Sequence, residues 1–386
     1  MRGERHQPTL SVVTPSMQAK VCMLTSVHRA LDNRIFHKEA KSLARAGYDV
    51  TIIGQHERDE IVEGIRIVAL PAPRNRLGRV TRSAWTAYRM ALRIDAAVYH
   101  FHDPELIPVS LLLRLHGKKT IYDVHEDVPR QILSKHYLSW IIRQTLSLAA
   151  SVVEWLAGKS MSAIVAAAPT IAQRFPAART ITVYNYAIAD ELVVAHPSSY
   201  AERSRAFVYP GVLARIRGIE EVIRALELLG ADPHARLDLA GEFVPREFRQ
   251  TLEALPGWRR VTYHGTVDRK ELARLLGEAR CGLVLHHPVP NEVDAQPIKL
   301  FEYMGAGLPV IASDFRPLRK IIGTEECGLL VDPLDPKAIA EAMRWILAHP
   351  AEAEAMGRNG RRAVMEKYNW EGESEKLLAL YRKLFS

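Results

Sequence analysis

Lys299 and Glu302 are the first residues whose type and spacing suggest chemistry, because both are charged and stand inside an apolar run, QPIKLFEYMGAGLPVIASD (296–314). In an α-helix the two side chains would lie roughly 60° apart on one face. Pro297 suits the first turn of such a helix, which leaves the amides of residues 298–300 free where phosphate binds. The pattern predicts a cation and a carboxylate beside an anion site, although a surface ion pair explains the spacing equally well.

Arg215 and Arg217 form a second charged pair, in GVLARIRG (211–218), between an expected strand and an expected helix. Two guanidinium groups at such a turn can clamp a diphosphate, since each presents a planar fork of donors. Two exposed loop arginines would look the same in the sequence, so that alternative stays open.

Histidines and carboxylates gather earlier in the chain. HFHDPE contains His100, His102 and Asp103, a combination that could ligate a metal. The two histidines alternate along an expected strand and so face one side, while Asp103 before Pro104 is typical of a helix start. His125 ends another expected strand and could hold a sugar hydroxyl or share a proton, or else cap a helix or fill the core.

The elements that must position these residues alternate between short apolar runs and longer amphipathic stretches. Such alternation requires right-handed crossovers and a parallel sheet covered on both faces. The pattern lapses at 191–205 into polar, proline-containing chain, which is typical of a linker, and then restarts. We therefore predict an α/β fold of two doubly wound, Rossmann-like domains. The expected strands cover 20–26, 50–54, 64–71, 96–103, 119–126, 162–168, 180–185, 206–212, 235–241, 260–267, 281–287 and 308–312.

These patterns give expected domain limits of 1–190 and 206–367, followed by a last helical segment at 368–386. Residues 1–18 carry charge but no apolar core of signal-peptide length, so we expect a disordered leader there. The most apolar long stretch, 138–169, is interrupted by charges, and we expect amphipathic helices packed on a sheet rather than a membrane span.

Composition narrows the class of protein. The chain has 386 residues, of which 48% are hydrophobic and 25% charged, as in soluble globular proteins of two domains. Cys22, Cys281 and Cys327 lie far apart, which fits a reducing compartment and argues against a disulfide framework or a zinc site. The sequence contains no GxGxxG, GxSxG or P-loop, which argues against a dinucleotide oxidoreductase, an α/β-hydrolase and a P-loop enzyme.

Positive charge is concentrated in one segment. The formal net charge is +8, and six arginines stand between residues 74 and 93 with no acid among them: Arg74, Arg76, Arg79, Arg82, Arg89 and Arg93. They could attract an anionic membrane surface or an anionic acceptor, or they could form a solvated helix face. Aromatic residues do not interleave with them and no nucleic-acid module is present, so we expect no nucleic-acid partner.

Several segments together resemble the retaining glycosyltransferases of the GT-B fold, in the large family 4-like group that contains bacterial capsule and exopolysaccharide enzymes. The resemblance covers nearly the whole chain. Besides 296–314, it is carried by LDNRIFHKEAKSLARAGYDVTIIG (31–54), HFHDPEL (100–106), YDVHEDVP (122–129), GVLARIRGIEEVIRAL (211–226) and YNWEGESEKLLALY (368–381). It implies a first domain that binds the acceptor, a second that binds the donor, and a closing helix that packs back on the first.

The resemblance also implies roles for single residues. Asp294 and Glu302 match two acidic residues eight positions apart, of which the second holds the donor ribose and the first faces the donor sugar. Asp294 stands where the family usually has glutamate. Arg217 matches a basic residue before a glycine, whereas Val212 replaces the family's other basic residue, so Arg215 would substitute for it. His125 matches a histidine that reaches the donor sugar or the leaving phosphate.

Two further groups of contacts are implied. The expected donor-binding residues are Arg215, Arg217, Lys299, Glu302, Gly265, Val267, Ile298 and Leu300. The expected acceptor-binding residues are Asp32, Asn33, Arg34, His102 and Glu126. The family holds its donors with cations and helix dipoles, so neither a metal nor a cofactor is expected.

The expected function is therefore transfer of a sugar, with retention, from a nucleotide-diphosphate donor, most often uridine diphosphate, to a glycan or lipid-linked acceptor. We expect a cytoplasmic protein, peripheral on the inner face of the membrane. A sugar-nucleotide epimerase or a phosphorylase on a related scaffold stays an alternative, and so does a non-catalytic protein that keeps the fold and binds a nucleotide or a glycan.

Overall fold

The computed structural model describes residues 19–72, 78–125, 127–135, 138–188, 199–230 and 234–386, without the side chains of Arg79 and Val80. The expected leader, residues 191–198 of the expected linker, Glu126, Arg74 and Arg76 lie outside the described residues. The chain divides into two compact units, Met1–Tyr122 and Asp123–Ser386. The domain limits expected from the sequence stay a prediction.

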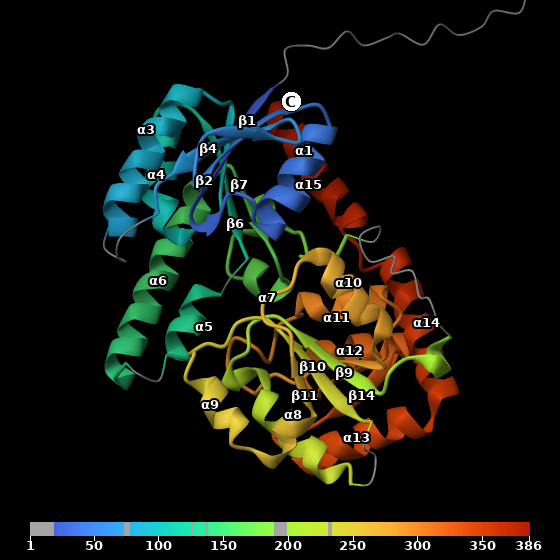
Figure 1. Ribbon diagram of the computed structural model, residues 1–386. Helices are drawn as coiled ribbons and strands as arrows, with labels where there is room; N and C mark the ends of the chain where they lie inside the picture. The colour runs from blue at the N-terminus through green and yellow to red at the C-terminus, as the bar shows by residue number, and fades with distance from the viewer. Residues whose placement is uncertain (1–18, 73–77, 126, 136–137, 189–198, 231–233) are drawn as a thin grey trace, which may run out of the picture. The chain divides into compact units, whose positions relative to one another are not determined.

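A twisted sheet lies at the centre of the first unit, with the strand order β3-β4-β2-β1-β5-β6 (Figure 1). Neighbouring strands are parallel except β3 and β4, which form a hairpin through Glu63 and Gly64, both at positive φ. The bounds are β1 (Lys20–Arg29), β2 (Asp49–Gln55), β3 (Glu60–Val62), β4 (Ile65–Leu70), β5 (Val98–Phe101) and β6 (Lys119–Val124).

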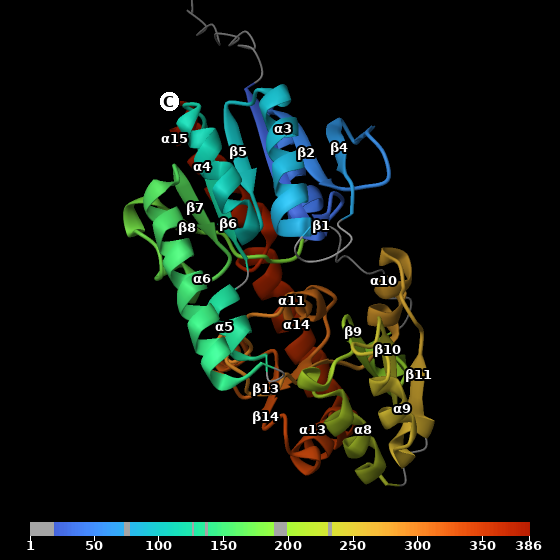
Figure 2. The same ribbon diagram turned by 90° about the vertical axis from the view of Figure 1, so that its left-hand side faces the viewer.

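Helices cover both faces of this sheet, because its central strands are apolar on both sides. Figure 2 shows α3 and α4 on one face of the sheet. Figure 1 shows α1, which follows a π-helical turn, on the other face. The bounds are the π-helical turn Asn33–Ala40, α1 (Lys41–Arg45), a second π-helical turn Arg79–Ser83, α3 (Ala84–Ile94), a 3₁₀ turn Pro104–Leu106 and α4 (Ile107–Leu115).

The second unit begins in the last residues of β6. Two further strands follow, and the amide of Ala167 donates to the carbonyl of Val124 at the end of β6 (3.0 Å), while β7 and β8 pair in parallel. The bounds are α5 (Val128–Leu133), α6 (Trp140–Ser160), β7 (Ala163–Ala166), α7 (Pro169–Ala172), the 3₁₀ turn Ala177–Arg179 and β8 (Thr180–Thr182). Among the described residues, no helix combines the length and the hydropathy needed to cross a membrane.

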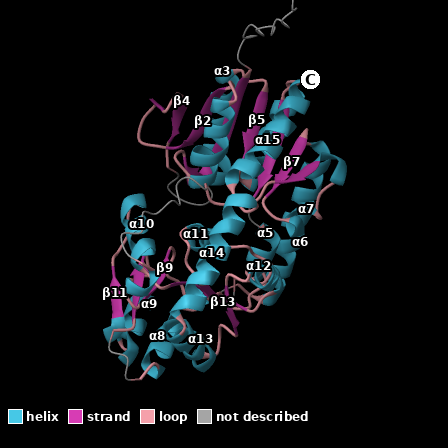
Figure 3. Ribbon diagram, turned by 90° about the vertical axis from the view of Figure 1, so that its right-hand side faces the viewer, coloured by secondary structure: helices cyan, strands magenta, loops and turns pink. Residues whose placement is uncertain are grey.

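A six-stranded, all-parallel sheet with the order β11-β10-β9-β12-β13-β14 forms the rest of the second unit. Successive residues of β9 serve opposite faces: Phe207 and Tyr209 join one hydrophobic core with α8 and α13, and Val208 joins another with α11 and α12. Figure 3 shows α8 beside α13. This double covering confirms the doubly wound α/β class predicted from the alternating pattern.

The strands of this second sheet are β9 (Ala206–Pro210), β10 (Arg236–Ala240), β11 (Val261–Tyr263), β12 (Cys281–Val284), β13 (Val310–Ser313) and β14 (Gly328–Val331). The 3₁₀ turns are Tyr200–Glu202, Arg215–Arg217 and Pro256–Arg260. The helices are α8 (Ile219–Leu228), α9 (Phe248–Glu253), α10 (Arg269–Glu278), α11 (Ile298–Gly305), α12 (Arg316–Glu325), α13 (Pro336–Ala348), α14 (Pro350–Glu366) and α15 (Trp370–Phe385).

The last helix, α15, is tied to the segment that follows β8. The amide of Tyr184 donates to Glu373 Oε2 (2.9 Å), and the amide of Trp370 donates to the carbonyl of Ala187 (2.9 Å). Tyr186 packs edge-on against Tyr368 just before the helix. The end of the chain is therefore fastened to residues 184–187.

Candidate active site

Backbone segments approach one another at the carboxyl ends of β9, β10 and β12, and glycines make this possible. A Cβ on Gly241 would lie 1.8 Å from the carbonyl oxygen of Gly211, and a Cβ on Gly218 would lie 2.0 Å from that of Leu285. All three glycines have positive φ, a conformation that other residues adopt at a cost. The loop after β9 is thus held against the ends of its neighbouring strands, where doubly wound sheets bind ligands.

Lys299 projects into this region from the first turn of α11. Its Nζ lies 3.6 Å from the centroid of the Tyr209 ring, at the end of β9, and 3.5 Å from where a Cβ on Gly211 would be. Burial, and then the neighbouring charge of Arg217, hold the pKa of Lys299 well below its ordinary value. A positive charge here lacks a sufficient counter-charge, so an anion bound beside it would be stabilised.

Arg217 lies in a network with two residues that follow β12. Its Nη1 donates to Glu292 Oε2 (2.8 Å), and His286 Nδ1 lies 2.7 Å from the same oxygen. Burial lowers the pKa of His286 to about 4, so the ring is neutral at neutral pH. Burial would raise the pKa of Glu292, but the bond from His286 and the positive charges of Arg217 and Lys299 lower it, so the carboxyl is ionised.

The helix that carries Lys299 confirms one expectation and corrects another. Leu300, Phe301 and Met304 are fully buried, as expected for the sheet-facing side, while Lys299 and Glu302 are only partly buried. The helix begins at Ile298 with Pro297 as its N-cap. The amide of Leu300 was expected to be free but donates to the carbonyl of Pro297 (3.0 Å), because the first turn tightens to a 3₁₀ bond.

Arg215 does not join the other cations. Its guanidinium pairs with Glu220 in the first turn of α8 and lies 5.1 Å from the centroid of the Phe248 ring, while more than half of the side chain is exposed. The structure therefore gathers Arg217, Lys299 and Glu302, and leaves Arg215 on the surface.

Gly265 and Val267 lie beyond the end of β11. The carbonyl of Gly265 accepts from the amide of Gly241 (2.7 Å), and Gly265 has positive φ. Val267 packs at the margin of the hydrophobic core around α11. The turn is thus fixed to the glycine-lined end of β10, beside the region that holds Lys299.

Asp294 and His125, the two expected catalytic residues, both belong to the second unit. Asp294 Oδ2 accepts from Arg130 Nη1 of α5 (2.5 Å), and a second bond joins Ser134 to Asn291 (3.0 Å). His125 is partly buried, with its Nδ1 3.9 Å from Asp123. Asp294 is therefore held by a charged partner in this structure.

Sequence reasoning missed His286 and Glu292. Both lie in HHPVPNE (286–292), which begins two residues after the end of the buried strand β12. Because ligands bind beyond the carboxyl ends of strands, a histidine and a glutamate at this place were the available signal. The spacing of eight residues before Glu302 predicted Asp294 instead.

The expected acceptor residues lie at the start of the π-helical turn in the first unit. Asp32 accepts from the amides of Arg34 (2.7 Å) and Ile35 (3.1 Å), so its carboxylate serves as the N-cap. Asn33 is partly buried. Arg34 is 3% exposed, and its Nε lies 3.0 Å from Glu39 Oε1. The guanidinium of Arg34 is thus committed to a buried carboxylate.

Asp103 is the N-cap residue of the 3₁₀ turn that leads into α4, as expected for a helix start, but its side chain does not make the capping bond. Its Oδ2 accepts instead from Thr25 Oγ1 (2.8 Å), from the amide of Ser26 (2.6 Å) and from the amide of Val27 (3.2 Å). The carboxylate is buried and fixes the second half of β1, because backbone amides there need an acceptor.

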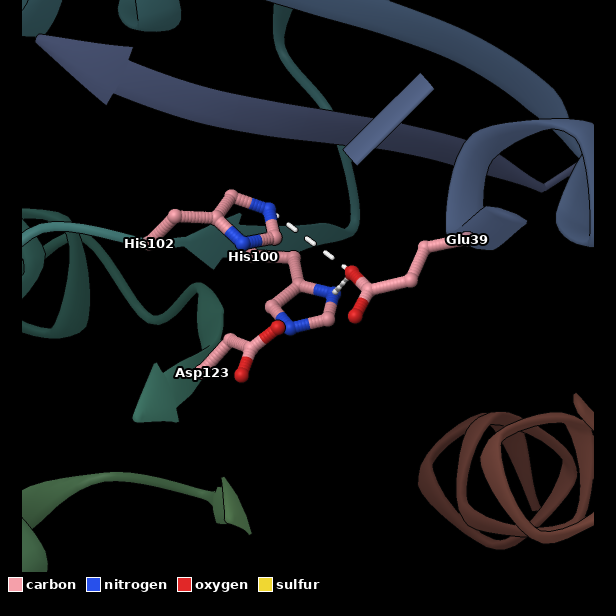
Figure 4. Close-up of side chains that lie close together, drawn as sticks. All are labelled: Glu39, His100, His102 and Asp123. Carbon is pink, nitrogen blue, oxygen red and sulfur yellow. Dashed lines mark ion pairs between the residues drawn. The ribbon is translucent and has the colours of Figure 1, made fainter. Parts of the chain in front are cut away.

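Four buried side chains of this region could offer ligands to a metal ion. Figure 4 shows these side chains, which belong to Glu39, His100, His102 and to Asp123 in β6. One potential ligand atom of each residue lies within 4.8 Å of those of the other three. The two histidine rings stack, as their shared side of the strand predicted. Since Arg34 already neutralises Glu39, a cation would have to compete with a fixed positive charge.

Two protein-family models match this chain. The model described as "Glycosyl transferases group 1" matches residues 196–363, and the one described as "Glycosyl transferase 4-like domain" matches residues 33–185.

Curated relatives extend the comparison. An MMP alpha-(1->4)-mannosyltransferase of Mycolicibacterium hassiacum is 25% identical over 183 residues, which are 47% of this chain and 43% of that protein. The D-rhamnosyltransferase WbpZ of Pseudomonas aeruginosa is 27% identical over 285 residues, 70% of this chain and 68% of that protein. The first match therefore spans less than half of its relative's length.

Solved structures agree in fold. Sucrose-phosphate synthase from Thermosynechococcus elongatus superimposes with a TM-score of 0.75 at 22% identity, over 95% of this chain and 99% of that one. HepE of Anabaena, in complex with UDP-glucose, gives 0.72 at 14% identity, over 94% and 99%. With both family models matched and the doubly wound sheets in place, the chain belongs to the family 4-like, group 1 glycosyltransferases and has the GT-B fold.

Proposed function

We propose that the chain is a retaining glycosyltransferase that moves a sugar from a nucleotide diphosphate, most often uridine diphosphate, to a glycan or lipid-linked acceptor in polysaccharide or glycoconjugate synthesis. Residues 206–367 would bind the donor and residues 1–190 the acceptor, in the cytoplasm. Family membership supports glycosyl transfer, and the UDP-glucose bound to HepE, a protein of the same fold, supports the class of donor.

The observation that carries the donor proposal is the closeness of two cations at the end of β9. Lys299 Nζ lies over the Tyr209 ring at the end of β9, and after burial the charge of Arg217 is the next cause that lowers the pKa of Lys299. A diphosphate between them would supply the missing negative charge and would be bound through charge-assisted hydrogen bonds. Glu302, one turn further along α11, would then accept from the ribose hydroxyls.

The chemistry would rest on charge stabilisation and positioning. As the bond from the sugar to the diphosphate breaks, negative charge develops on the leaving oxygen, and Arg217 and Lys299 are placed to stabilise it. The acceptor oxygen bonds to the anomeric carbon as the bond from that carbon to the diphosphate breaks, and the acceptor proton passes to the departing phosphate, so no enzyme nucleophile is needed. The two cations would take the part that a metal plays elsewhere. His125 and Asp294 would contact the donor sugar, Asp294 on release from Arg130.

The acceptor would be contacted by Asp32, Asn33 and His102. Glu126, which lies outside the described residues, would contact it as well. Arg34 would act indirectly, because its guanidinium is buried against Glu39. It would hold the π-helical turn that presents its neighbours to an acceptor.

Titration of uridine diphosphate by calorimetry tests the donor site. Arg217→Ala and Lys299→Met should each weaken binding by about 1–3 kcal/mol, the range for hydrogen bonds to charged groups. Arg215→Ala tests the third expected cation, and its pairing with Glu220 predicts a smaller loss. Unchanged affinity in both of the first two variants would refute the proposed diphosphate site.

Measurements of stability distinguish a loss of uridine diphosphate binding from misfolding of the variant. Burial disfavours the charged form of Lys299 in the ligand-free site, so Lys299→Met should leave the thermal midpoint unchanged or raise it while binding is lost. Release of the nucleotide diphosphate that depends on an added acceptor would identify transfer. Release without an acceptor would favour the epimerase alternative, and no release with any acceptor would favour a non-catalytic protein.

A further inference from the structure

The long helix α6 exposes its large apolar side chains to solvent, while two of its polar residues, Ser147 and Glu154, are buried. Its most exposed side chains include Trp140 (66%), Ile141 (68%) and Leu148 (67%). This is the reverse of the pattern that packs a helix against a core. The expectation that residues 138–169 pack their apolar face on a sheet is therefore wrong for α6.

Helical spacing places the exposed residues in one band. Ile141, Leu148 and Val152 lie within about 40° of one another at 100° per residue. The buried Ser147, Glu154, Ala157 and Gly158 lie on the opposite side. Trp155 and Leu156 lie within about 60° of the centre of the band. The other exposed apolar residues lie further round the helix: Trp140, Ile142, Leu146 and Val153.

Specific contacts hold the helix in this orientation. Glu154 pairs with Arg174, whose Nη1 also donates to Asp127 Oδ1 (3.0 Å). Arg143 Nη1 donates to the carbonyl of Leu133 at the end of α5 (2.9 Å). These buried and half-buried polar bonds would be lost if the helix turned its apolar band inward, so the exposed band is a fixed feature of the fold.

The charges of α6 indicate what covers the band. Glu154 is its only acidic residue and faces inward, as does the partly buried Arg143, so the one charge on the outward side is the positive charge of Lys159, in line with the band. Lys159 Nζ lies 3.8 Å from the Trp155 ring centroid. Tryptophan, an apolar band and cations without acids are typical of a helix lying in the interface of an anionic membrane.

A second copy of the chain fits this surface less well. Two α6 helices packed in parallel through this band would place Lys159 near Lys159, which brings like charges together where water is excluded and is unfavourable. Anionic headgroups would instead neutralise Lys159, and no helix among the described residues is long and apolar enough to span a bilayer.

We propose that α6 is a membrane-docking helix that lies in the plane of an anionic lipid surface with the band around Ile141, Leu148 and Val152 inserted among the acyl chains. Over 21 residues the helix is about 32 Å long, which is enough to bury a continuous apolar strip. The proposal is independent of the sugar chemistry, because lipid binding needs neither donor nor acceptor.

Flotation with vesicles of phosphatidylcholine and phosphatidylglycerol tests the proposal. The triple variant Ile141→Gln, Leu148→Gln, Val152→Gln should lose about tenfold or more of its partitioning, since each side chain would bury apolar area in the membrane. The matched control Leu228→Gln, Leu334→Gln, Met365→Gln alters three residues of 44%, 49% and 48% exposure outside α6, and should partition like the unaltered protein.

Tryptophan fluorescence provides a second readout that loss of folding cannot imitate. Trp140 and Trp155 should enter the lipid, so emission should shift to the blue on adding these vesicles, and the shift should vanish in the variant Trp140→Phe, Trp155→Phe. It should persist in Trp85→Phe, which removes an exposed tryptophan of the first unit.

Three results would overturn the proposal. The unaltered protein could fail to float with anionic vesicles, or the α6 triple variant could float as well as the control. Alternatively, the α6 variant could convert a dimer into a monomer without changing flotation, which would assign the band to a second copy of the chain.

Discussion

At the scale of single residues, the candidate donor site consists of opposed charges that a ligand would rearrange. Arg217 and Lys299 are the cations, and Glu292 and Glu302 are the carboxylates that partly compensate them. Glu292 is held by His286 and Arg217, whereas Glu302 stands beside Lys299 on α11. We propose different roles for the two carboxylates: Glu292 positions a cation, and Glu302 accepts hydrogen bonds from the donor ribose.

Glu302 can be tested by changing both partners of the proposed contact. Glu302→Ala and a 2′-deoxy nucleotide should each lower affinity by about 1–3 kcal/mol, since bonds to an ionised carboxylate are stronger than neutral ones. The deoxy nucleotide should lose little further affinity with the variant, because the partner is already absent. Additive losses in calorimetric titrations would mean that Glu302 does not contact the ribose, and a surface ion pair with Lys299 would explain the spacing.

His286 gives the folded protein a measurable pH dependence. Burial lowers its pKa from 6.5 to about 4, so between those values the unfolded chain binds a proton that the folded chain does not. Stability should therefore fall as the pH is lowered from 7 to 4, by about 3 kcal/mol for this group at 1.36 kcal/mol per pKa unit.

His286→Gln provides the comparison, because glutamine can still bond to Arg217 and Glu292 but does not titrate. Denaturant unfolding at pH 7 and pH 4 should show the smaller loss in the variant. Equal losses in both proteins would assign the acid sensitivity to groups other than His286. Glu292 would add little over this range, because its pKa is lowered and its contribution to stability falls only below its ordinary pKa of 4.5.

At the scale of elements, the site depends on turns that bring strand ends together. Gly218 ends the 3₁₀ turn of Arg217 and begins α8, with φ of +71°. The carbonyl of Leu285 at the end of β12 occupies the place of a side chain. The position of Arg217 is thus determined by a contact between two backbones.

Gly218→Ala should therefore destabilise the protein and weaken binding of uridine diphosphate. Gly230→Ala is the matched control, because Gly230 has a similar φ of +64° but no atom within 4 Å of an added Cβ. The control should cost only the conformational penalty, about 1–2 kcal/mol, and leave affinity unchanged. If both variants behave alike in unfolding and in titration, the close approach at Leu285 has no role in the site.

At the scale of the whole molecule, charge and apolar surface fall on different elements. The net charge of +8 includes exposed Arg82, Arg89 and Arg93 in the first unit, while the exposed apolar band lies on α6 in the second. Long-range attraction to an anionic surface depends on the charge and is screened by salt. Insertion among the acyl chains depends on apolar area and is not screened by salt.

Vesicle binding should therefore have two separable parts. Arg82→Gln, Arg89→Gln, Arg93→Gln should reduce binding to anionic vesicles at low salt by about tenfold, since each cation near an anionic surface contributes, and should flatten the dependence on salt. The α6 triple variant should weaken binding at every salt concentration. Equal binding of the unaltered protein to neutral and anionic vesicles would contradict the electrostatic part.

The sequence alone determined the features that follow from local periodicity. Alternating apolar and amphipathic runs predicted two doubly wound sheets, and helical spacing predicted that Leu300 and Met304 would be buried while Lys299 and Glu302 share the other side. Short-range patterns carry this information because strands and helices repeat every 2 and 3.6 residues. The family resemblance, carried by motifs along nearly the whole chain, was confirmed as well.

Only the tertiary structure decided which charged groups meet. Arg217 contacts His286 and Glu292, about 70 residues further along the chain. Arg215, two residues before Arg217, pairs with Glu220 instead. Arg34 is buried against Glu39. In α6, Glu154 and Arg143 face inward because Arg174 and the carbonyl of Leu133 are their partners there. Such outcomes depend on which strand ends and helices become neighbours in the folded chain, and no local pattern in the sequence encodes that choice.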